Sequence, residues 1–358
     1  MNKNKRHIYL TRNVAALFLS FSLNVYAQAD ASASKERPLF NEDSTLAVTI
    51  EGPLQTIMRN RDDPKEAPGK LSYTDSDGTL HTLDMNLRMR GKFRAKRDIC
   101  NFTPLRVNFK KSQVKGTLFA GQDKIKLVTD CQSGKSRHQQ LVLKEYLAYK
   151  ILNLISDRSF SARLLRITYV DTDRKGKSRE SYGFFIEDQD HIADRLGLKR
   201  AKMPRTKYGA LQAAQANLVT VYEYFIANTD FSMVAGPPDS NCCHNTVLYQ
   251  NNDEPLIAIP YDFDHAGLID APYASPNPRF RLKTVTQRLY RGQCANNELL
   301  DSTFQRFTAK RDDINELIKN LEGFSTKSNA RTMSLVDDFY KDISTPKKIE
   351  KKFFKKCS

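Results

Sequence analysis

Two acidic residues follow an apolar segment in the second half of the chain. Residues 256–259 read Leu-Ile-Ala-Ile and lead into Asp262 and Asp264, and Gly267 follows three residues later. Sites collect where strands end, and hard divalent cations prefer oxygen ligands such as carboxylates. The pattern therefore predicts a site for Mg²⁺ or Mn²⁺. A polar turn without any chemistry is the alternative that this stretch leaves open.

Other residues suited to the same chemistry lie upstream. Asp230 follows a long apolar segment, and Asn245 lies in the polar loop after it. Phosphoryl transfer needs a divalent cation, an acid near the attacking hydroxyl, and Lys or Arg beside the phosphates. Basic residues come from the first third of the chain: Lys126, with Lys124 as a rival on the same strand face, and Arg90. Ordinary surface positions are the alternative for each of these cations.

The elements that must position these residues follow from two kinds of periodicity. Alternation of apolar and polar residues predicts strands, and spacing of three and four residues predicts helices. The predicted strands cover residues 45–54, 104–111, 123–130, 161–171, 178–188, 246–250 and 256–260, with a hairpin over 70–91. The predicted helices cover 138–155 and 208–228, and helices dominate after residue 295.

Three segments resemble the secreted kinases of the CotH type (spore coat protein H), which have a protein-kinase-like fold. They are MRGKFRAKRDICNFTPLRVNFKK, then KIKLVTDC with LVLKEYLAYKIL, then YFIANTDFS with HNTVLYQ and IPYDFDHAG. Together they span residues 85–270. The resemblance implies an α+β, two-lobed protein-kinase-like fold with a β-rich N-lobe and a mainly helical C-lobe.

The resemblance also implies roles for the acidic and amide residues. Asp230 would orient the attacking hydroxyl or accept its proton, while Asn245 and Asp262 would bind Mg²⁺. Asp264 stands where protein kinases carry Gly, and it would be a further metal ligand. The spacing of 15 residues between Asp230 and Asn245 differs from the five of ordinary kinases, and no Gly-rich loop is present.

Nucleotide contacts follow from the same resemblance. Lys126 would hold the phosphates of ATP or another nucleotide, and Glu145 on the following helix would pair with that lysine. Arg90 and Arg94, near Gly91, would add phosphate contacts, and the strand that ends at Glu187 would face the adenine. Without the resemblance, Glu145 would be read as an exposed position on an amphipathic helix.

The N-terminus predicts export. A basic start, an apolar stretch over residues 14–25 and the sequence Ala27-Gln28-Ala29 are typical of a signal peptide that is cleaved after Ala29. The mature protein would be periplasmic or secreted, and an uncleaved anchor is the alternative. The predicted organisation is a signal peptide at 1–29, a flexible lead at 30–45, an N-lobe at 46–190 and a C-lobe at 191–358. The C-lobe contains a catalytic-loop-like segment at 228–270.

The net charge of +16 favours anionic partners, and it falls to +12 when the four cations of the predicted signal peptide are removed. No compact basic and aromatic motif of a nucleic-acid-binding module occurs, so we expect no specific nucleic-acid partner. The basic C-terminal tail, KKIEKKFFKK, allows contact with a membrane surface.

Six cysteines in an exported chain predict disulfides. We expect Cys100 to pair with Cys131, and Cys242 or Cys243 to pair with Cys294. A zinc site formed by the Cys-Cys-His-Asn segment is disfavoured because adjacent cysteines chelate poorly.

Two functions stay open on the sequence. One is an exported, Mg²⁺-dependent transfer of phosphate from a nucleotide to a hydroxyl of a protein or envelope component. The other is a non-catalytic, disulfide-bonded envelope protein that binds an anionic ligand or partner.

Overall fold

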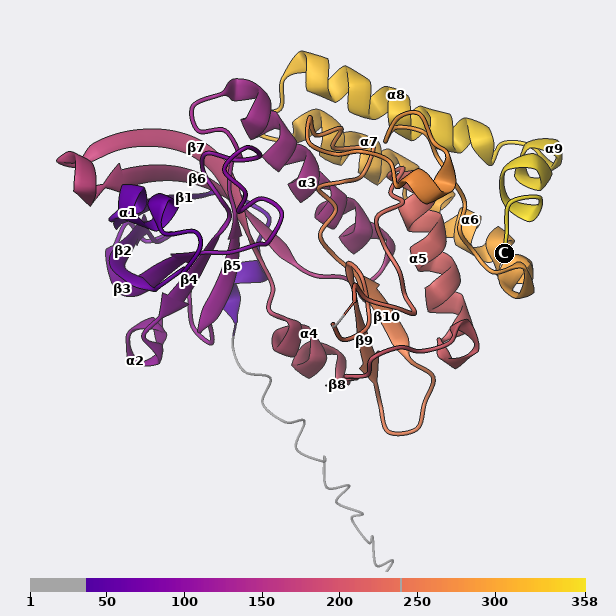
Figure 1. Cartoon of the computed structure of the whole chain (residues 1–358), viewed down its shortest axis with the longest axis horizontal. Coiled ribbons are helices and arrows are strands. Elements are labelled where there is room, and N and C mark those ends of the chain that lie inside the picture. The colour runs from indigo at the N-terminus through magenta and orange to yellow at the C-terminus, as the bar shows by residue number, and fades with distance from the viewer. Residues whose placement is uncertain (1–36, 239) are drawn as a thin grey trace, which may run out of the picture. The chain divides into compact units, whose positions relative to one another are not determined.

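Seven strands from the first half of the chain close into a barrel (Figure 1). The computed structural model describes residues 37–238 and 240–358, and within them the strand order is β1-β2-β3-β4-β5-β7-β6. The strands are β1 (Leu46–Gly52), β2 (Ala67–Thr74), β3 (Leu80–Met89), β4 (Leu105–Phe109), β5 (Lys124–Val128), β6 (Ala162–Asp171) and β7 (Lys177–Ile186). β1 pairs with β2 in antiparallel and with β6 in parallel, and the second pairing closes the barrel.

Alternating side chains fill the barrel, as the sequence pattern predicts. On β4, Leu105, Val107 and Phe109 are buried, whereas the residues between them are only partly buried. The buried residues of the other barrel strands join the same apolar cluster. The period-2 pattern therefore identifies the inward face of each strand correctly.

The predicted fold class, a two-lobed α+β protein-kinase-like fold, is wrong. A closed seven-stranded barrel takes the place of the predicted β-rich N-lobe. The closing contact joins Leu46 to Leu165 and runs in register to the pair Gly52 and Asp171. Such a long-range parallel pairing leaves no mark in the alternation of either strand, so the sequence pattern indicates a β-rich region without showing that it closes.

The helices follow mainly in the second half. They are α1 (Leu54–Arg59), α2 (Lys111–Val114), α3 (Ser136–Ile155), α4 (Gln189–Leu196), α5 (Ala213–Phe225), α6 (Leu300–Ala309), α7 (Arg311–Asn320), α8 (Thr326–Asp342) and α9 (Pro346–Ile349). The long helix α3 packs against β6 and β7 on one side and α7 on another. It is buried around most of its circumference, so polar residues such as Lys144 and Glu145 are buried with it.

A separate three-stranded sheet carries the acidic segment. Its order is β10-β9-β8, with β8 (Lys199–Arg200), β9 (Thr246–Gln250) and β10 (Ile257–Pro260). α5 packs against β10, so the ends of both elements lie in one region. The predicted helix over 208–228 is thus confirmed over a shorter range, with a 3₁₀ turn at Tyr208–Ala210 before it.

The predicted signal peptide lies outside the described residues. Part of the predicted flexible lead is described, and it is anchored: Leu39 is buried, and the Arg163 guanidinium donates to the carbonyl of Glu42 over 2.6 Å. The predicted division between residues 190 and 191 falls within α4. Along the described ranges we find no helix with the length and apolar character needed to cross a bilayer.

Three disulfides link the described cysteines. The predicted bond Cys100–Cys131 is confirmed. The predicted bond to Cys294 is wrong, because Cys294 pairs with Cys357 and the adjacent Cys242 and Cys243 pair with each other. The Cys294–Cys357 bond joins the C-terminus to the segment that precedes α6, a contact that depends on the path of the whole chain.

The C-terminal tail is anchored as well as basic. Phe353 is fully buried, with its ring centroid 4.7 Å from that of Tyr224. The lysines of the tail remain at the surface or partly buried. Contact of this tail with a membrane stays a prediction.

Candidate functional site

The β9–β10 hairpin brings Asn245, just before β9, close to the segment after β10 that carries Asp262. Pro260 is paired with Thr246, and one step beyond this pair the backbone N–H of Tyr261 donates to the carbonyl of Asn245 over 3.0 Å. Both Asn245 and Asp262 adopt left-handed backbone conformations, with φ of 51° and 62°. Asn and Asp tolerate this region better than most residues, and such conformations collect at functional sites.

A rigid loop after α5 presents Asp230. The Asn228 side chain accepts a hydrogen bond from the Asp230 backbone N–H over 2.9 Å and donates to buried Glu223 over 2.8 Å. Arg291 donates to the carbonyls of Thr229 and Phe231, on either side of Asp230. The backbone that carries Asp230 is therefore held from two directions.

The carboxylate of Asp230 meets the hairpin directly. Asn245 Nδ2 donates to the Asp230 carbonyl over 2.7 Å and to its carboxylate over 3.1 Å. His244 Nε2 lies 2.8 Å from the other carboxylate oxygen. Burial raises the pKa of Asp230, but the hydrogen bond and charge of His244, with His265 and Asn245, outweigh burial and leave the pKa below its usual value. Asp230 is thus ionised at neutral pH.

Lys126 on β5 approaches the hairpin from the barrel. Its ammonium lies 5.1 Å from the ring centroid of Tyr261, the residue before Asp262. Burial, together with the charge of Arg90, lowers the pKa of Lys126 to about 8, against the opposing charges of Asp188 and Asp262. The rival Lys124 is exposed, so the structure distinguishes two lysines that the alternation could not.

Arg90, at the end of β3, belongs to the same cationic group. Its backbone N–H donates to the carbonyl of Pro104 over 2.8 Å. Burial lowers the pKa of Arg90, and the charge of Asp262 is the strongest opposing influence. Lys126 and Arg90 thus supply positive charge to the site, and the charge of Asp262 acts on both of them.

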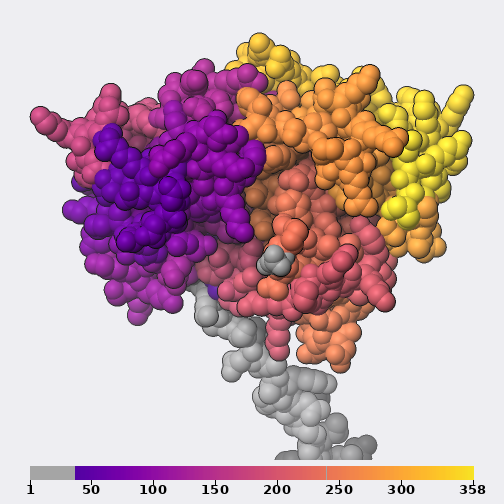
Figure 2. All heavy atoms as spheres, in the orientation of Figure 1, coloured from indigo at the N-terminus to yellow at the C-terminus, as the bar shows by residue number. Residues whose placement is uncertain are grey.

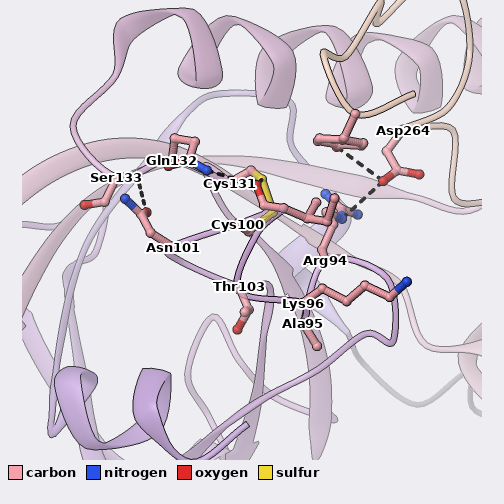
Figure 3. The surroundings of a disulfide bond; sticks show 12 residues. Arg94, Ala95, Lys96, Cys100, Asn101, Thr103, Cys131, Gln132, Ser133 and Asp264 are labelled. Carbon is pink, nitrogen blue, oxygen red and sulfur yellow. Dashed lines mark hydrogen bonds and ion pairs between the residues drawn. A yellow bond between two sulfur atoms is a disulfide. The ribbon is translucent and has the colours of Figure 1, made fainter. Parts of the chain in front are cut away.

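Arg94 connects three acids of the site. Its guanidinium lies 3.2 Å from Glu145, 3.2 Å from Asp264 and 3.6 Å from Asp262. Figure 3 shows the Arg94 side chain directed at Asp264. Arg94 lies on the segment before Cys100, which the disulfide to Cys131 holds in place. Arg94 is only 8% exposed, so this is a buried ionic cluster in which one cation faces three carboxylates.

Glu145 and Asp264 are therefore committed to Arg94. The structure gives Glu145 this arginine as its ion-pair partner, where the resemblance implied Lys126. Burial raises the pKa of Glu145 to about 7, against the opposing charge of Arg94. Asp264 is buried, and it also accepts a hydrogen bond from the Tyr273 hydroxyl over 3.3 Å. Of the two acids of the motif, Asp262 is the more open, with a side chain that is 37% exposed.

Glu187 lies beyond the end of β7 and is bound within the protein. Arg195 donates to its two carboxylate oxygens over 3.1 and 3.0 Å, and the backbone N–H of Ser161 donates over 3.0 Å. A contact of Glu187 with a nucleotide stays a prediction.

Sequence reasoning missed several residues that position the site. Tyr149 accepts a hydrogen bond from the Asp262 backbone N–H over 2.9 Å, and it lies four residues after Glu145 on α3. That spacing places both side chains on one helix face, which is a signal that the sequence contains. Arg291 and His244 carry no such signal, because their roles depend on loops that meet only in the fold.

Gly267 brings the two loops of the site together. Its N–H donates to the carbonyl of Ala227, and the next residue, Leu268, donates to Ile226. A Cβ at Gly267 would lie 2.5 Å from the carbonyl oxygen of Val285. The glycine is therefore required for close approach of the backbones.

The site supplies few ligands to a metal. Among the described residues no group of three or more His, Cys, Asp or Glu is arranged to hold a metal ion. Cys242 and Cys243 are bonded to each other, which argues against the zinc alternative. Asp262 and the side-chain oxygen of Asn245 remain as a pair of oxygen donors.

The face shown in Figure 2 is hollowed where purple segments from the first half of the chain meet orange segments from the second half. Comparison of the chain with protein-family models finds no match, and comparison with curated proteins finds none either.

Proposed function

We propose that this protein transfers a phosphoryl group from a nucleoside triphosphate to a hydroxyl group of an acceptor, with Mg²⁺ or Mn²⁺ as cofactor. One observation carries the proposal. The Asp230 carboxylate accepts a hydrogen bond from Asn245, and the Asn245 carbonyl accepts one from the backbone N–H of Tyr261, the residue before Asp262. The Lys126 ammonium lies over the ring of the same tyrosine. An acid, two oxygen donors and a cation thus converge from distant parts of the chain. The proposal rests on this convergence and does not need a kinase fold.

The donor set fits a hard divalent cation. Mg²⁺ is usually held by one or two protein oxygen ligands, together with waters and substrate phosphates. The open carboxylate of Asp262 and the side-chain oxygen of Asn245, which accepts no hydrogen bond within residues 37–238 and 240–358, supply such a pair. When bound, the cation neutralises charge on the phosphates.

The remaining side chains fit the transfer step. Lys126 and Arg90 would bind the phosphates, and ionised Asp230 would accept the hydrogen bond of the acceptor hydroxyl. The hydroxyl oxygen forms a bond to the γ-phosphorus as the bond from that phosphorus to the β–γ bridging oxygen breaks. The hydroxyl proton passes to Asp230, and the nucleoside diphosphate leaves with the bridging oxygen. Arg94 is a positioning residue that keeps Asp262 in place.

Export is part of the proposal. Three disulfides within the described residues support an oxidising compartment. The acceptor would then be a hydroxyl of a secreted protein or of an envelope sugar. The resemblance of three segments between residues 85 and 270 to CotH-type kinases supports this assignment.

Nucleotide-dependent thermal stabilisation tests the proposal. ATP, GTP, CTP and UTP are each added with Mg²⁺ or Mn²⁺ to the wild-type protein, to Asp262→Asn and to Asp253→Asn. Asp253 is an exposed acid in the β9–β10 turn and serves as a matched control. We expect at least one nucleotide to stabilise the wild type and the control but not Asp262→Asn. No stabilisation of the wild type by any nucleotide with either metal would refute the proposal.

Activity is measured separately, as release of nucleoside diphosphate or transfer of the labelled γ-phosphoryl group. Asp230→Asn should retain nucleotide binding and lower the rate by about 10²-fold or more, since general-base contributions lie in that range. Retention of the full rate would remove Asp230 from the mechanism.

The second function, non-catalytic binding of an anionic ligand, is favoured by one observation. Arg94 forms ion pairs with Asp264 and Glu145, and among the described residues no group of three or more His, Cys, Asp or Glu is left that could hold a metal. Stabilisation by nucleotide without metal dependence, together with no phosphoryl transfer, is the result expected from a binding protein.

A further inference from the structure

A cavity of about 500 Å³ lies at the starts of α3 and α8, beside the loop that ends at Asp270. Four cationic side chains line it: Arg137 and Lys144 from α3, and Lys327 and Arg331 from α8. Its single acidic residue is Asp270. The lining therefore has a net charge of about +3 with Lys and Arg protonated at neutral pH.

The four cations outnumber the one acid, Asp270, that lines the cavity among the described residues. Within the described part of the chain, none of the four forms an ion pair with a carboxylate. Lys144 is the most unusual, because it is only 8% exposed and its ammonium donates to the carbonyl oxygen of Ile269 over 3.3 Å. Burial lowers the pKa of Lys144, Asp270 opposes this, and Arg331 and Arg137 add to it. Burying an ammonium is costly unless its charge is balanced, and Asp270 is one acid beside four cations.

The walls of the cavity are held in place. Gln140 on α3 donates to the carbonyl of Gly323 over 2.8 Å and accepts from the N–H of Ser325 over 2.9 Å. Ser325 caps α8 by accepting from the N–H of Ser328. The first turns of α3 and α8 are thereby fixed around one space, and the positive ends of both helix dipoles add to the potential of the four side chains.

We infer that this cavity is a binding site for a small, multiply charged phosphate compound of the pyrophosphate class. The ligand oxygens would accept from Lys144 at the base and from Arg137, Lys327 and Arg331 at the rim. A volume of about 500 Å³ accommodates more than one phosphate group, and several cations without partners favour a ligand with more than one negative charge. None of the residues Asp230, Asn245, Asp262 and Lys126 lines this cavity, so it is separate from the proposed nucleotide site.

Isothermal titration with sodium pyrophosphate tests the inference in the presence of EDTA, which removes the metal that the proposed nucleotide site requires. The wild type and the variants Lys327→Gln/Arg331→Gln and Lys355→Gln/Lys356→Gln are compared. All four lysines and arginines changed here are exposed, so the fold should survive both double substitutions. We expect at least a tenfold loss of affinity in the first variant and no loss in the second. Equal loss in both variants, or no binding to the wild type at millimolar pyrophosphate, would overturn the inference.

A third variant separates binding from general damage. Lys144→Met removes the buried charge but preserves most of the side-chain volume. It should abolish pyrophosphate binding and raise the midpoint of thermal unfolding measured without ligand, because a buried ammonium beside Arg137 and Arg331 is removed. Retained binding in Lys144→Met would exclude this lysine from the site. Asp262→Asn should bind pyrophosphate like the wild type, so failure of the proposed function would leave this result unaffected.

Discussion

Replacement of Glu145 by Gln tests the electrostatics of the buried ionic cluster. Glu145 is 3% exposed and lies beside Arg94, which also contacts Asp264 and Asp262. An ion pair normally lowers the pKa of a carboxyl group, but here burial and the two other carboxylates raise it to about 7. The ionised form of Glu145 is therefore disfavoured by folding, whereas the neutral form is not. Glutamine mimics that neutral form.

The sign and the size follow from proton linkage. Between pH 4.5 and about 7, the folded protein holds the proton of Glu145 more tightly than the unfolded chain, so the contribution of this group to stability falls as pH rises. Each pKa unit corresponds to 1.36 kcal/mol, so displacement from 4.5 to about 7 corresponds to about 3 kcal/mol. Glu145→Gln should therefore gain about 3 kcal/mol relative to the wild type as pH rises from 4.5 to 8.

Urea unfolding followed by circular dichroism measures this difference, since the chain has no tryptophan for fluorescence. The free energy of unfolding is determined at several pH values between 4.5 and 8, without reductant so that the disulfides persist. Glu316→Gln, at an exposed position of α7, should show no pH-dependent difference from the wild type. If Glu145→Gln instead becomes less stable than the wild type as pH rises, the charge of Arg94 dominates and the reasoning fails.

Three further predictions concern the loops, the disulfide and the cationic side of the site. Gly267→Ala should lower the free energy of unfolding by about 1–3 kcal/mol in the same urea assay, because its Cβ would meet the carbonyl of Val285, and an unchanged midpoint would show that the loops can separate. Cys100→Ser/Cys131→Ser should lower the free energy of unfolding by about 2–4 kcal/mol, because the bond closes a loop between cysteines 31 residues apart. An unchanged free energy of unfolding would show that the barrel holds this segment without the disulfide. The affinity for ATP with Mg²⁺ should fall as pH rises through about 8, where Lys126 loses its proton, and should stay constant in Lys126→Arg; matching pH profiles would contradict the role of Lys126.

Local sequence patterns predicted the elements of the fold well. The alternation in residues 104–111 and 123–130 identified β4 and β5, and the short apolar run before Asp262 identified β10. They did not predict which strand lies beside β1. Its parallel partner β6 is more than a hundred residues away, and the alternation of β1 is compatible with any neighbouring strand. The fold class was wrong for that reason.

The candidate site divides in a similar way. The end of a predicted strand singled out Asp262, and the order of a long helix, a polar loop and that strand, together with the family resemblance, singled out Asp230 and Asn245. The partner of Glu145 was decided by packing, since Arg94 and Glu145 meet only when the loop after β3 lies against α3.

Local backbone elements, the inward faces of the strands and the chemical types available to a site follow from the sequence, because they depend on neighbours within a few residues. Long-range contacts set the closure of the barrel, the burial of Lys126 in contrast to Lys124, the pairing of Cys294 with Cys357 and the ionic cluster around Arg94. Each of these depends on contacts between distant segments and on burial, and burial decides whether a charged group must find a partner.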